Sequence, residues 1–274
     1  MKYILLTLLT LFLCFLAGWF IEALLAARGK RHGRAPMPRP RRLLLSFGIS
    51  LVLVLAGSLG YLLPYAHAED SALAYMSGTD TVQVQKMPHG YFFDGPGEET
   101  AILFVPGAKV DAKAYASLLS LLAEGGADCY LYEPPFHMAF SVSGAAQEAM
   151  TDCPHTHWYA AGHSLGGVTA ASYAIKHPAA FDGIILLASY PADTVPNGLS
   201  ICSIYGNQDT KLDTGAYESH RNYFSADTKE VVLEGGNHAQ FGDYGPQKGD
   251  SPATISAAEQ QRQTASVILA FLQR

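Results

Sequence analysis

The sequence predicts an α/β protein in which a mainly parallel, doubly wound sheet with helices on both faces follows two transmembrane helices. Two long uncharged apolar runs stand at the start of the chain. After them, short apolar runs typical of buried strands alternate with helix-prone segments, which favours a parallel sheet. A glycine-flanked serine at residues 162–166 lies between one such strand and one such helix. These observations together indicate a membrane anchor followed by one α/β domain.

The two apolar runs are long enough to cross a bilayer. No Asp, Glu, Lys or Arg occurs between Tyr3 and Ile21, or between Leu43 and His67. A helix rises about 1.5 Å per residue, so each run spans the hydrocarbon core. We therefore expect transmembrane helices at about 3–27 and 43–64, within a membrane anchor over 1–68. As an alternative, the Ala-His-Ala sequence ending at residue 68 resembles a signal-peptide cleavage site, which would release the domain.

The connection between the apolar runs, residues 28–42, is rich in Lys, Arg and Pro. Basic loops between membrane helices face the cytoplasm, and prolines disfavour a helix there. The predicted location is therefore the cell membrane, as a multi-pass protein with an extracytoplasmic domain over 69–274. That domain holds 23 Asp or Glu against 10 Lys or Arg. Its negative charge argues against nucleic acid as a partner, whereas the anchor makes the lipid bilayer a partner.

Within the domain, the expected elements alternate regularly. A hairpin comes first, with strands near 81–85 and 91–93 around a Pro-His-Gly turn. Continuous apolar runs then predict buried strands at 101–105, 129–132, 158–163, 183–188, 200–205 and 230–233. Helices are expected between and after them at 112–124, 144–151, 165–177, 217–223 and 256–272, the first of these capped by Asp111.

The chain has 4 cysteines. Cys129 and Cys153 each precede an apolar strand-like run, so outside the cytoplasm a disulfide between them is one option, which spacing alone does not establish. Cys14 falls in the first membrane run and Cys202 inside a strand pattern. No Cys or His spacing is typical of a metal site, and neither a metal nor another cofactor is implied.

Residues 162–166, Gly-His-Ser-Leu-Gly, carry the clearest signal of chemistry. They stand between a β-prone run and a helix-prone run, which is the strand–turn–helix context of a nucleophile elbow. In such a turn the serine adopts a strained conformation that holds its hydroxyl clear of the sheet, and the flanking glycines avoid crowding. We predict Ser164 as the nucleophile and a structural role for the neighbouring His163.

Two further candidates, Asp209 and His238, directly follow later strands. The carboxyl ends of parallel strands meet at one edge of the sheet, so these side chains are expected near Ser164. A serine hydroxyl needs an adjacent imidazole as base, and a carboxylate orients that imidazole and stabilises its charged form. We predict His238 as the base and Asp209 as its orienting acid. Asp213 is the alternative carboxylate, but it stands further from the strand end and suits a helix cap.

The chain resembles the α/β-hydrolase superfamily over about residues 78–274. The motifs that carry the resemblance are Gly-His-Ser-Leu-Gly-Gly at 162–167, Gly-Asn-Gln-Asp at 206–209 and Gly-Gly-Asn-His at 235–238. More narrowly, the sequence is similar to small bacterial members of the dienelactone-hydrolase or lipase type that lack a large lid. The short connection after the strand at 183–188 agrees with this, because about a dozen residues are too few for a lid domain.

The resemblance implies the same roles for the serine, aspartate and histidine, and it adds an oxyanion hole. Its two donors would be the backbone N–H groups of Leu165 and Ala108. The chain departs from the family pattern here, since Pro-Gly-Ala at 106–108 replaces a His-Gly pair that is common in the family. The expected substrate-binding residues are Gly107 and Lys109 beside this donor, and Pro135 and Phe136 in an apolar wall.

The sequence as a whole predicts a serine hydrolase that acts on a carboxylic ester of a small molecule through an acyl-enzyme. The same triad would also suit an acyltransferase, a thioesterase or an amidase. A different class of protein, a catalytically silent, membrane-tethered binding module with this fold, is the other alternative, because fold alone does not establish function.

Overall fold

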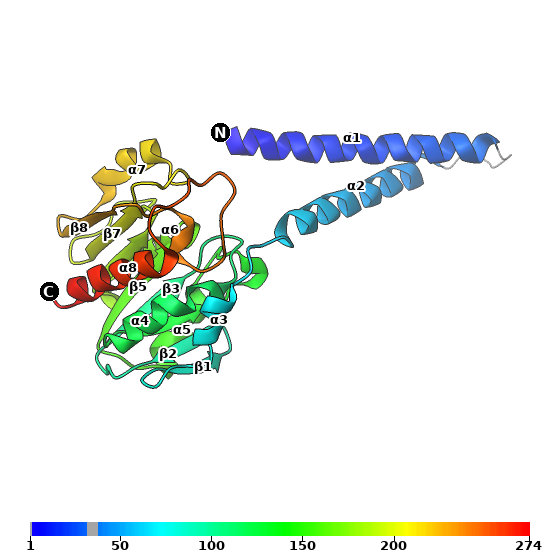
Figure 1. Cartoon of the computed structure of the whole chain (residues 1–274). Coiled ribbons are helices and arrows are strands. Elements are labelled where there is room, and N and C mark those ends of the chain that lie inside the picture. Colours follow the sequence, from blue (N-terminus) through cyan, green and yellow to red (C-terminus); the bar gives the residue numbers. More distant parts are fainter. Residues whose placement is uncertain (1, 32–37) are drawn as a thin grey trace. The chain divides into compact units, whose positions relative to one another are not determined.

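A computed structural model of the chain describes residues 2–31 and 38–274 and divides into two compact units. Unit 1 covers Met1–Pro64 and unit 2 covers Tyr65–Arg274 (Figure 1). This boundary precedes the predicted one at 68/69, because the first residues of unit 2 already contact the rest of it. The Tyr65 ring stacks on His137 with 3.6 Å between centroids, and Ala66 forms a β-bridge with Val110.

In the described part of unit 1, two helices are present, α1 (Lys2–Arg31) and α2 (Arg39–Leu62). By length and composition, α2 is the one helix among the described residues that could cross a membrane, with a mean hydropathy of 2.2. The first predicted span, about 3–27, stays a prediction, since the side chains of residues 2–12 lie outside the described set. Glu22 of α1 pairs with Arg42 of α2 at 2.8 Å, so the one acidic side chain in the sequence of unit 1 meets a cation.

Both ends of the predicted basic loop at 28–42 are helical in the structure. Helix α1 continues to Arg31 and α2 begins at Arg39, while residues 32–37 lie outside the described chain. The expectation that prolines exclude a helix is wrong for residues 39–42, because Pro40 occupies the first turn of α2. Proline is tolerated there, since the N–H groups of a first turn have no intrahelical acceptor.

Unit 2 is built on an 8-stranded sheet with the order β1-β2-β4-β3-β5-β6-β7-β8. β1 and β2 form the predicted antiparallel hairpin, β2 pairs antiparallel with β4, and the remaining pairs are parallel. The predicted mainly parallel sheet is therefore confirmed. The strands are β1 (Gln83–Met87), β2 (Gly90–Asp94), β3 (Thr100–Val105), β4 (Asp128–Tyr132), β5 (His157–His163), β6 (Gly183–Leu187), β7 (Ser200–Gly206) and β8 (Thr228–Leu233).

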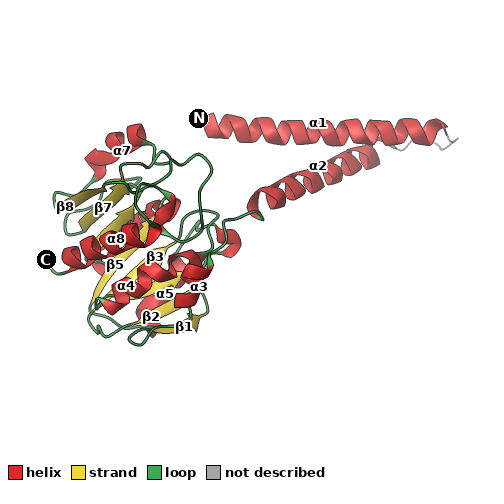
Figure 2. Ribbon diagram, viewed as in Figure 1, coloured by secondary structure: helices red, strands yellow, loops and turns green. Residues whose placement is uncertain are grey.

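Helices lie on both faces of this sheet (Figure 2). One core is shared by the sheet with α4 and α8, and a second core is shared with α5 and α6. Asp111 caps the segment before α4 as predicted, by accepting a hydrogen bond from the Lys113 N–H at 3.1 Å. The helices of unit 2 are α3 (Asp70–Tyr75), α4 (Ala116–Glu124), α5 (Ser143–Asp152), α6 (Leu165–Lys176), α7 (Thr214–His220) and α8 (Ala257–Leu272).

Strand β3 shows how an uninterrupted apolar run serves both cores. Ile102 and Phe104 belong to the core beneath α4 and α8, whereas Leu103 and Val105 belong to the core beneath α5 and α6. Successive side chains of a strand point to opposite faces, so a strand covered on both sides must be apolar throughout. The site residues follow such buried strands, and the sheet therefore provides them with a rigid base.

The four cysteines are free thiols. Cys129 and Cys153 are both buried and do not form the disulfide considered above. Burial raises the pKa of Cys153 to about 11, so this thiol is protonated at neutral pH. Within the described chain, no three His, Cys, Asp or Glu side chains are grouped as a metal ion would require.

Candidate active site

Ser164 occupies a strained turn between β5 and α6. It follows His163, the last residue of β5, and precedes Leu165, the first residue of α6. Its backbone angles are φ 52° and ψ −125°. A residue with a Cβ adopts a positive φ rarely, and such strain persists only where the surrounding structure enforces it.

Two glycines allow the close backbone contacts that enforce this turn. A Cβ on Gly166 would lie 2.3 Å from the carbonyl oxygens of Val105 and Pro106, at the end of β3. A Cβ on Gly162 would lie 2.5 Å from the carbonyl carbon of Gly166. The predicted reason for both glycines is therefore correct: the space between the strand ends and the first turn of α6 has no room for a side chain.

The backbone of Ser164 is held on both sides, and its hydroxyl is available. The Ser164 N–H donates to Leu187 O at 2.9 Å, and the Ser164 carbonyl accepts from Ser189 Oγ at 2.7 Å. Ser164 Oγ forms no hydrogen bond with any described residue, His238 included. Catalytic hydrogen bonds are often long in ligand-free enzymes and tighten when the substrate binds. The half-buried serine is thus positioned through its backbone rather than through its hydroxyl.

Asp209 and His238 form a buried pair. His238 Nδ1 lies 2.8 Å from Asp209 Oδ2, and the two side chains are 4% and 1% exposed. The other carboxylate oxygen of Asp209 accepts from the N–H groups of Lys211 and Leu212, both at 2.8 Å. These donors fix the carboxylate in the orientation that binds Nδ1. A hydrogen bond at Nδ1 leaves Nε2 as the nitrogen that is free to exchange a proton with a substrate or nucleophile.

The alternative carboxylate, Asp213, caps a helix. Its Oδ1 accepts a hydrogen bond from the Ala216 N–H at 2.9 Å, at the start of α7. Asp213 is therefore a helix N-cap, as its position in the sequence suggested. The structure pairs Asp209 with His238 and leaves Asp213 out of the site.

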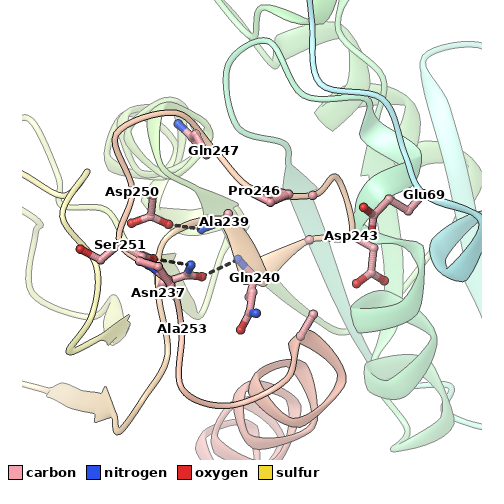
Figure 3. A pocket seen from close by; sticks show the side chains of 14 residues that line it. Glu69, Asn237, Ala239, Gln240, Asp243, Pro246, Gln247, Asp250, Ser251 and Ala253 are labelled. Carbon is pink, nitrogen blue, oxygen red and sulfur yellow. Dashed lines mark hydrogen bonds between the residues drawn. The ribbon is translucent and has the colours of Figure 1, made fainter.

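Asp250 links the two loops that carry the pair, and Figure 3 shows its bond to the His238 loop. Its Oδ2 accepts from the Ala239 N–H at 3.0 Å, and Ala239 is the residue after His238. Its Oδ1 accepts from the Thr210 N–H at 3.3 Å, and Thr210 is the residue after Asp209. One carboxylate thus holds the backbone beside each member of the pair, which fixes their relative position.

The loop that carries His238 is also held by α8. Gln260 Nε2 donates to the Asn237 carbonyl at 2.8 Å, and Gln260 Oε1 accepts from the Asn237 N–H at 3.0 Å. Gln260 is fully buried, so this paired contact is shielded from water. Residues of this loop and Glu69 line a cavity of about 450 Å³ (Figure 3). Its lining combines small apolar residues with acidic and amide side chains, and two of these, Asn237 and Asp250, hydrogen-bond within the loop.

The backbone N–H groups of the two predicted oxyanion donors differ from those of their neighbours in their hydrogen bonding. The Gly107 N–H donates to the Tyr115 hydroxyl at 3.1 Å, and the Lys109 N–H donates to the His137 carbonyl at 2.7 Å. The N–H groups of Ala108 and Leu165 donate to no described residue. Free backbone donors next to a nucleophile are what stabilisation of an oxyanion requires. The geometry of this loop therefore suits the two donors named from the sequence.

Tyr115 and His163 lie between Gly107 and His238. The Tyr115 hydroxyl accepts from Gly107 and lies 2.8 Å from His163 Nδ1, so we assign its proton to that contact. His163 Nε2 is buried without a partner, and the His163 ring lies 4.6 Å from the His238 ring between centroids. Burial and the neighbouring His238 hold the pKa of His163 well below its ordinary value, so His163 is uncharged at neutral pH.

The four predicted substrate-binding residues lie in two adjoining segments. Gly107 is buried and Lys109 half-buried in the oxyanion loop, whereas Pro135 and Phe136 are exposed in the turn after β4. Lys109 and Phe136 have φ of 60° and 55°, which is unusual for residues with side chains. The Lys109–His137 hydrogen bond joins the two segments, and a role of the four residues in substrate binding stays a prediction.

Sequence reasoning missed three residues that hold the site: Tyr115, Asp250 and Gln260. Gln260 could have been found, because Gln260 and Thr264 lie on the same face of α8 as the apolar Ile268 and Phe271, where a polar pair requires an explanation. Asp250 lies in a loop rich in Gly, Pro and Ser, which has no periodic pattern. Its role depends on two loops that approach it only after folding.

Comparisons with known proteins identify the family. The sequence profile of the alpha/beta hydrolase family matches residues 101–262, which is more than half of the chain. The chain therefore belongs to this family, and the matched region holds Ser164, Asp209 and His238. No curated protein sequence matches the chain significantly.

Solved structures of hydrolases share the fold at low sequence identity. A dienelactone hydrolase from Anabaena variabilis is 13% identical, with a TM-score of 0.54, and covers 69% of this chain and 98% of its own. A predicted CIB-like hydrolase from Thermoplasma acidophilum is 12% identical, with a TM-score of 0.51 and coverages of 70% and 98%. A membrane phospholipase A, described as a bacterial virulence factor, is 16% identical, with a TM-score of 0.53 and coverages of 85% and 98%.

Proposed function

We propose that this hydrolase is a membrane-anchored serine hydrolase that cleaves a carboxylic ester of a small molecule. The observation that carries the proposal is the combination of a strained Ser164 at the start of α6 with a buried Asp209–His238 pair at 2.8 Å. Both features follow parallel strands of one sheet, where α/β enzymes place their chemistry. A membrane phospholipase A is among the proteins of similar fold, which supports ester chemistry at a membrane.

In the proposed mechanism, Ser164 Oγ attacks the ester carbonyl carbon while His238 Nε2 takes the hydroxyl proton. Asp209 stabilises the imidazolium that results, through its contact with Nδ1. The N–H groups of Leu165 and Ala108 bind the oxyanion of the tetrahedral intermediate. His238 then returns the proton to the leaving alcohol, and an acyl-enzyme remains. Water, deprotonated by His238, attacks this acyl-enzyme; the acid is released, and His238 returns the proton to Ser164 Oγ.

The proposed location is the cell membrane, with α1 and α2 as spanning helices and unit 2 on the extracytoplasmic side. The length and apolar composition of α2 support the anchor. The Glu22–Arg42 pair supports a hairpin of two helices, because a charge inside a bilayer requires a partner. The basic residues 28–42 between the helices support a cytoplasmic connection.

Labelling with a fluorophosphonate tests the activated serine. The full chain, solubilised in mild detergent, is compared with Ser164→Ala and His238→Ala. We expect labelling to be lost in both variants, because the probe reacts only with a serine that a base has activated. Ser172→Ala, a half-buried serine on the same helix α6, is the matched control and should label like the parent chain.

Either result of this experiment is informative. Loss of labelling in both variants supports the hydrolase and leads to a screen of ester, thioester and amide substrates, with alcohols as competing acceptors to detect acyl transfer. A folded parent chain that does not label contradicts the proposal. The membrane-tethered binding module would then be the better description.

A further inference from the structure

Three large exposed apolar side chains of unit 2 belong to the residue after Ser164 and to the segment after β4. Phe136, Phe140 and Leu165 are 57%, 77% and 42% exposed. We call these three residues the apolar rim. Leu165 directly follows Ser164, and the two phenylalanines come from the segment after β4. Among the described residues of unit 2, the other large exposed apolar residues are Leu73 and Val232, on α3 and β8.

Hydrogen bonds hold the phenylalanine segment between the oxyanion loop and α6. The Lys109 N–H donates to the His137 carbonyl at 2.7 Å. Thr169 Oγ1, on the second turn of α6, donates to the Ala139 carbonyl at 2.8 Å. The segment is thus attached at one side to the loop of Ala108 and at the other to the helix that begins after Ser164. The apolar rim therefore lies on segments that are attached to both sides of the Ser164 turn.

The exposure of this segment is imposed by its backbone. Phe136 and His137 are consecutive residues with φ of 55° and 53°. Strained conformations of this kind persist where the fold maintains them, and they are concentrated at functional sites. A large apolar side chain held in water by such a turn indicates a surface that is covered when the protein works.

The chain that leaves the anchor reaches unit 2 at the same place. The Tyr65 ring stacks on the His137 ring at 3.6 Å. The Ala66 N–H donates to the Lys109 carbonyl, and the Ala66 carbonyl accepts from the Asp111 N–H, both at 2.8 Å. Only Leu63 and Pro64 separate the end of α2 from Tyr65. The covalent link to the apolar helix is thus fastened to the wall that carries the apolar rim.

We propose that the apolar rim docks on the surface of a zwitterionic phospholipid bilayer, so that an ester with a long acyl chain passes from the bilayer to Ser164. This inference rests on the proposed function and on α2 as a membrane anchor. Residues 134–147 contain no Asp, Glu, Lys or Arg, although unit 2 as a whole is acidic. The segment itself therefore suits a neutral interface, at which exposed phenylalanines bind well, and the cation beside it is Lys176, which lines a cavity with Phe140.

A second copy of the chain is the competing occupant. A stable interface between proteins buries about 800 Å² on each partner, and three side chains provide only a small part of that area. A bilayer requires no such complementary surface, because its affinity grows with each apolar group that enters it.

Tryptophan fluorescence measures the docking directly. The full chain with Trp19→Phe is reconstituted in phosphatidylcholine vesicles whose acyl chains carry bromine, and Phe140→Trp is compared with Val232→Trp. Trp158 is buried in both variants and serves as a constant background. Val232 is a matched control, since it is 43% exposed but lies on the edge strand β8. We expect bromine to quench most of the emission that Phe140→Trp adds and to leave the emission that Val232→Trp adds unchanged.

Hydrolysis rates provide the second measurement. Phe140→Ser and Val232→Ser, in the full chain in vesicles, are tested with p-nitrophenyl acetate and with p-nitrophenyl palmitate dissolved in the bilayer. Phe140→Ser should lower the palmitate rate about tenfold, because the rim loses its largest exposed apolar group. The acetate rate should stay at the parent value, since the acetate ester arrives from water. Val232→Ser should change neither rate.

The outcomes separate the docking from the proposed function. Acetate hydrolysis without quenching at position 140 overturns the docking and leaves the hydrolase intact. Quenching at position 140 in a chain that hydrolyses neither ester supports the docking and contradicts the hydrolase. Equal losses on both esters in Phe140→Ser overturn the docking, because they assign Phe140 to catalysis. Unquenched emission from position 140 together with chain-to-chain cross-linking at that position assigns the rim to a second copy and also overturns the docking.

Discussion

The turn that carries Ser164 and the pair formed by Asp209 and His238 follow strands of the same sheet, but they are maintained in different ways. The turn depends on backbone contacts, in which Gly162 and Gly166 leave no room for a side chain. The pair depends on side-chain hydrogen bonds from distant positions, above all those of Asp250. Ser164, the proposed nucleophile, is therefore positioned by local geometry, and the proposed base and acid, His238 and Asp209, by long-range contacts.

Substitutions in the two parts of the site should therefore have different effects. A backbone turn fails when an added atom meets a carbonyl group that cannot move, so its failure affects folding. A side-chain hydrogen bond can be lost while the fold survives, so its failure affects the geometry of catalysis. Substitutions in the turn should therefore change stability and activity together, whereas substitutions around the pair should change activity first.

Gly166→Ala should have the largest effect. The new Cβ would meet the Val105 and Pro106 carbonyl oxygens at 2.3 Å, and neither backbone can withdraw without moving β3. We expect loss of activity and a decrease in the free energy of unfolding on the order of 3 kcal/mol, measured by urea denaturation in detergent. Gly215→Ala is the control, because its Cβ would lie 3.4 Å from its nearest neighbour, Asp213 Oδ1. An active Gly166→Ala with the stability of the parent chain would show that the turn is not held by close packing.

Asp209→Asn should lower kcat by about four orders of magnitude with little change in stability. The amide cannot stabilise the imidazolium of His238 and favours the wrong tautomer. The measurement is the steady-state hydrolysis of a short-chain ester. Asp213→Asn is the matched control: it preserves an oxygen acceptor for the Ala216 N–H and should leave kcat unchanged. A larger loss for Asp213→Asn than for Asp209→Asn would reverse the assignment of the acid.

Asp250→Ala should lower kcat about a hundredfold, because it frees the backbone beside both Asp209 and His238. Asp250→Asn retains one oxygen acceptor, so its kcat should lie between those of the parent and the alanine variant. Asp193→Ala, an exposed loop aspartate that bonds only the next N–H, is the control. If both Asp250 variants keep the parent kcat while they unfold more easily, Asp250 supports the fold rather than the pair.

His163 should cause a small dependence of stability on pH. The pKa of His163 in the folded protein is well below the ordinary 6.5. Below about pH 6.5 the unfolded chain therefore binds a proton at His163 that the folded chain does not bind. The contribution is complete above pH 6.5 and is lost as the pH falls, by at most about 1.4 kcal/mol per unit. Melting temperatures of the parent chain between pH 7.5 and 5.5 should therefore decline more steeply than those of His163→Asn.

The asparagine side chain introduced by His163→Asn keeps an oxygen acceptor for the Tyr115 hydroxyl, so the comparison isolates the titration. His177→Asn, which replaces an exposed histidine, is the control and should follow the parent curve. Equal slopes for His163→Asn and the parent chain would contradict a buried, uncharged His163.

The sequence by itself determined the parts of this protein that depend on neighbours along the chain. Apolar runs buried on both faces and the helices between them predicted the mainly parallel sheet, and the glycines around Ser164 predicted the nucleophile turn. Both are local patterns, because the period of burial and the room for a Cβ depend on a few consecutive residues. The side-chain pairing of Asp209 with His238 also followed, since parallel strands end at one edge.

Only the tertiary structure decided what depends on residues far apart in the chain. The strand order, the link that Asp250 makes between two loops, and the contact of Tyr65 with His137 have no local pattern. The same holds for the buried Tyr115–His163 contact. Each of these features depends on which distant residues come into contact when the chain packs, and packing is a property of the whole fold.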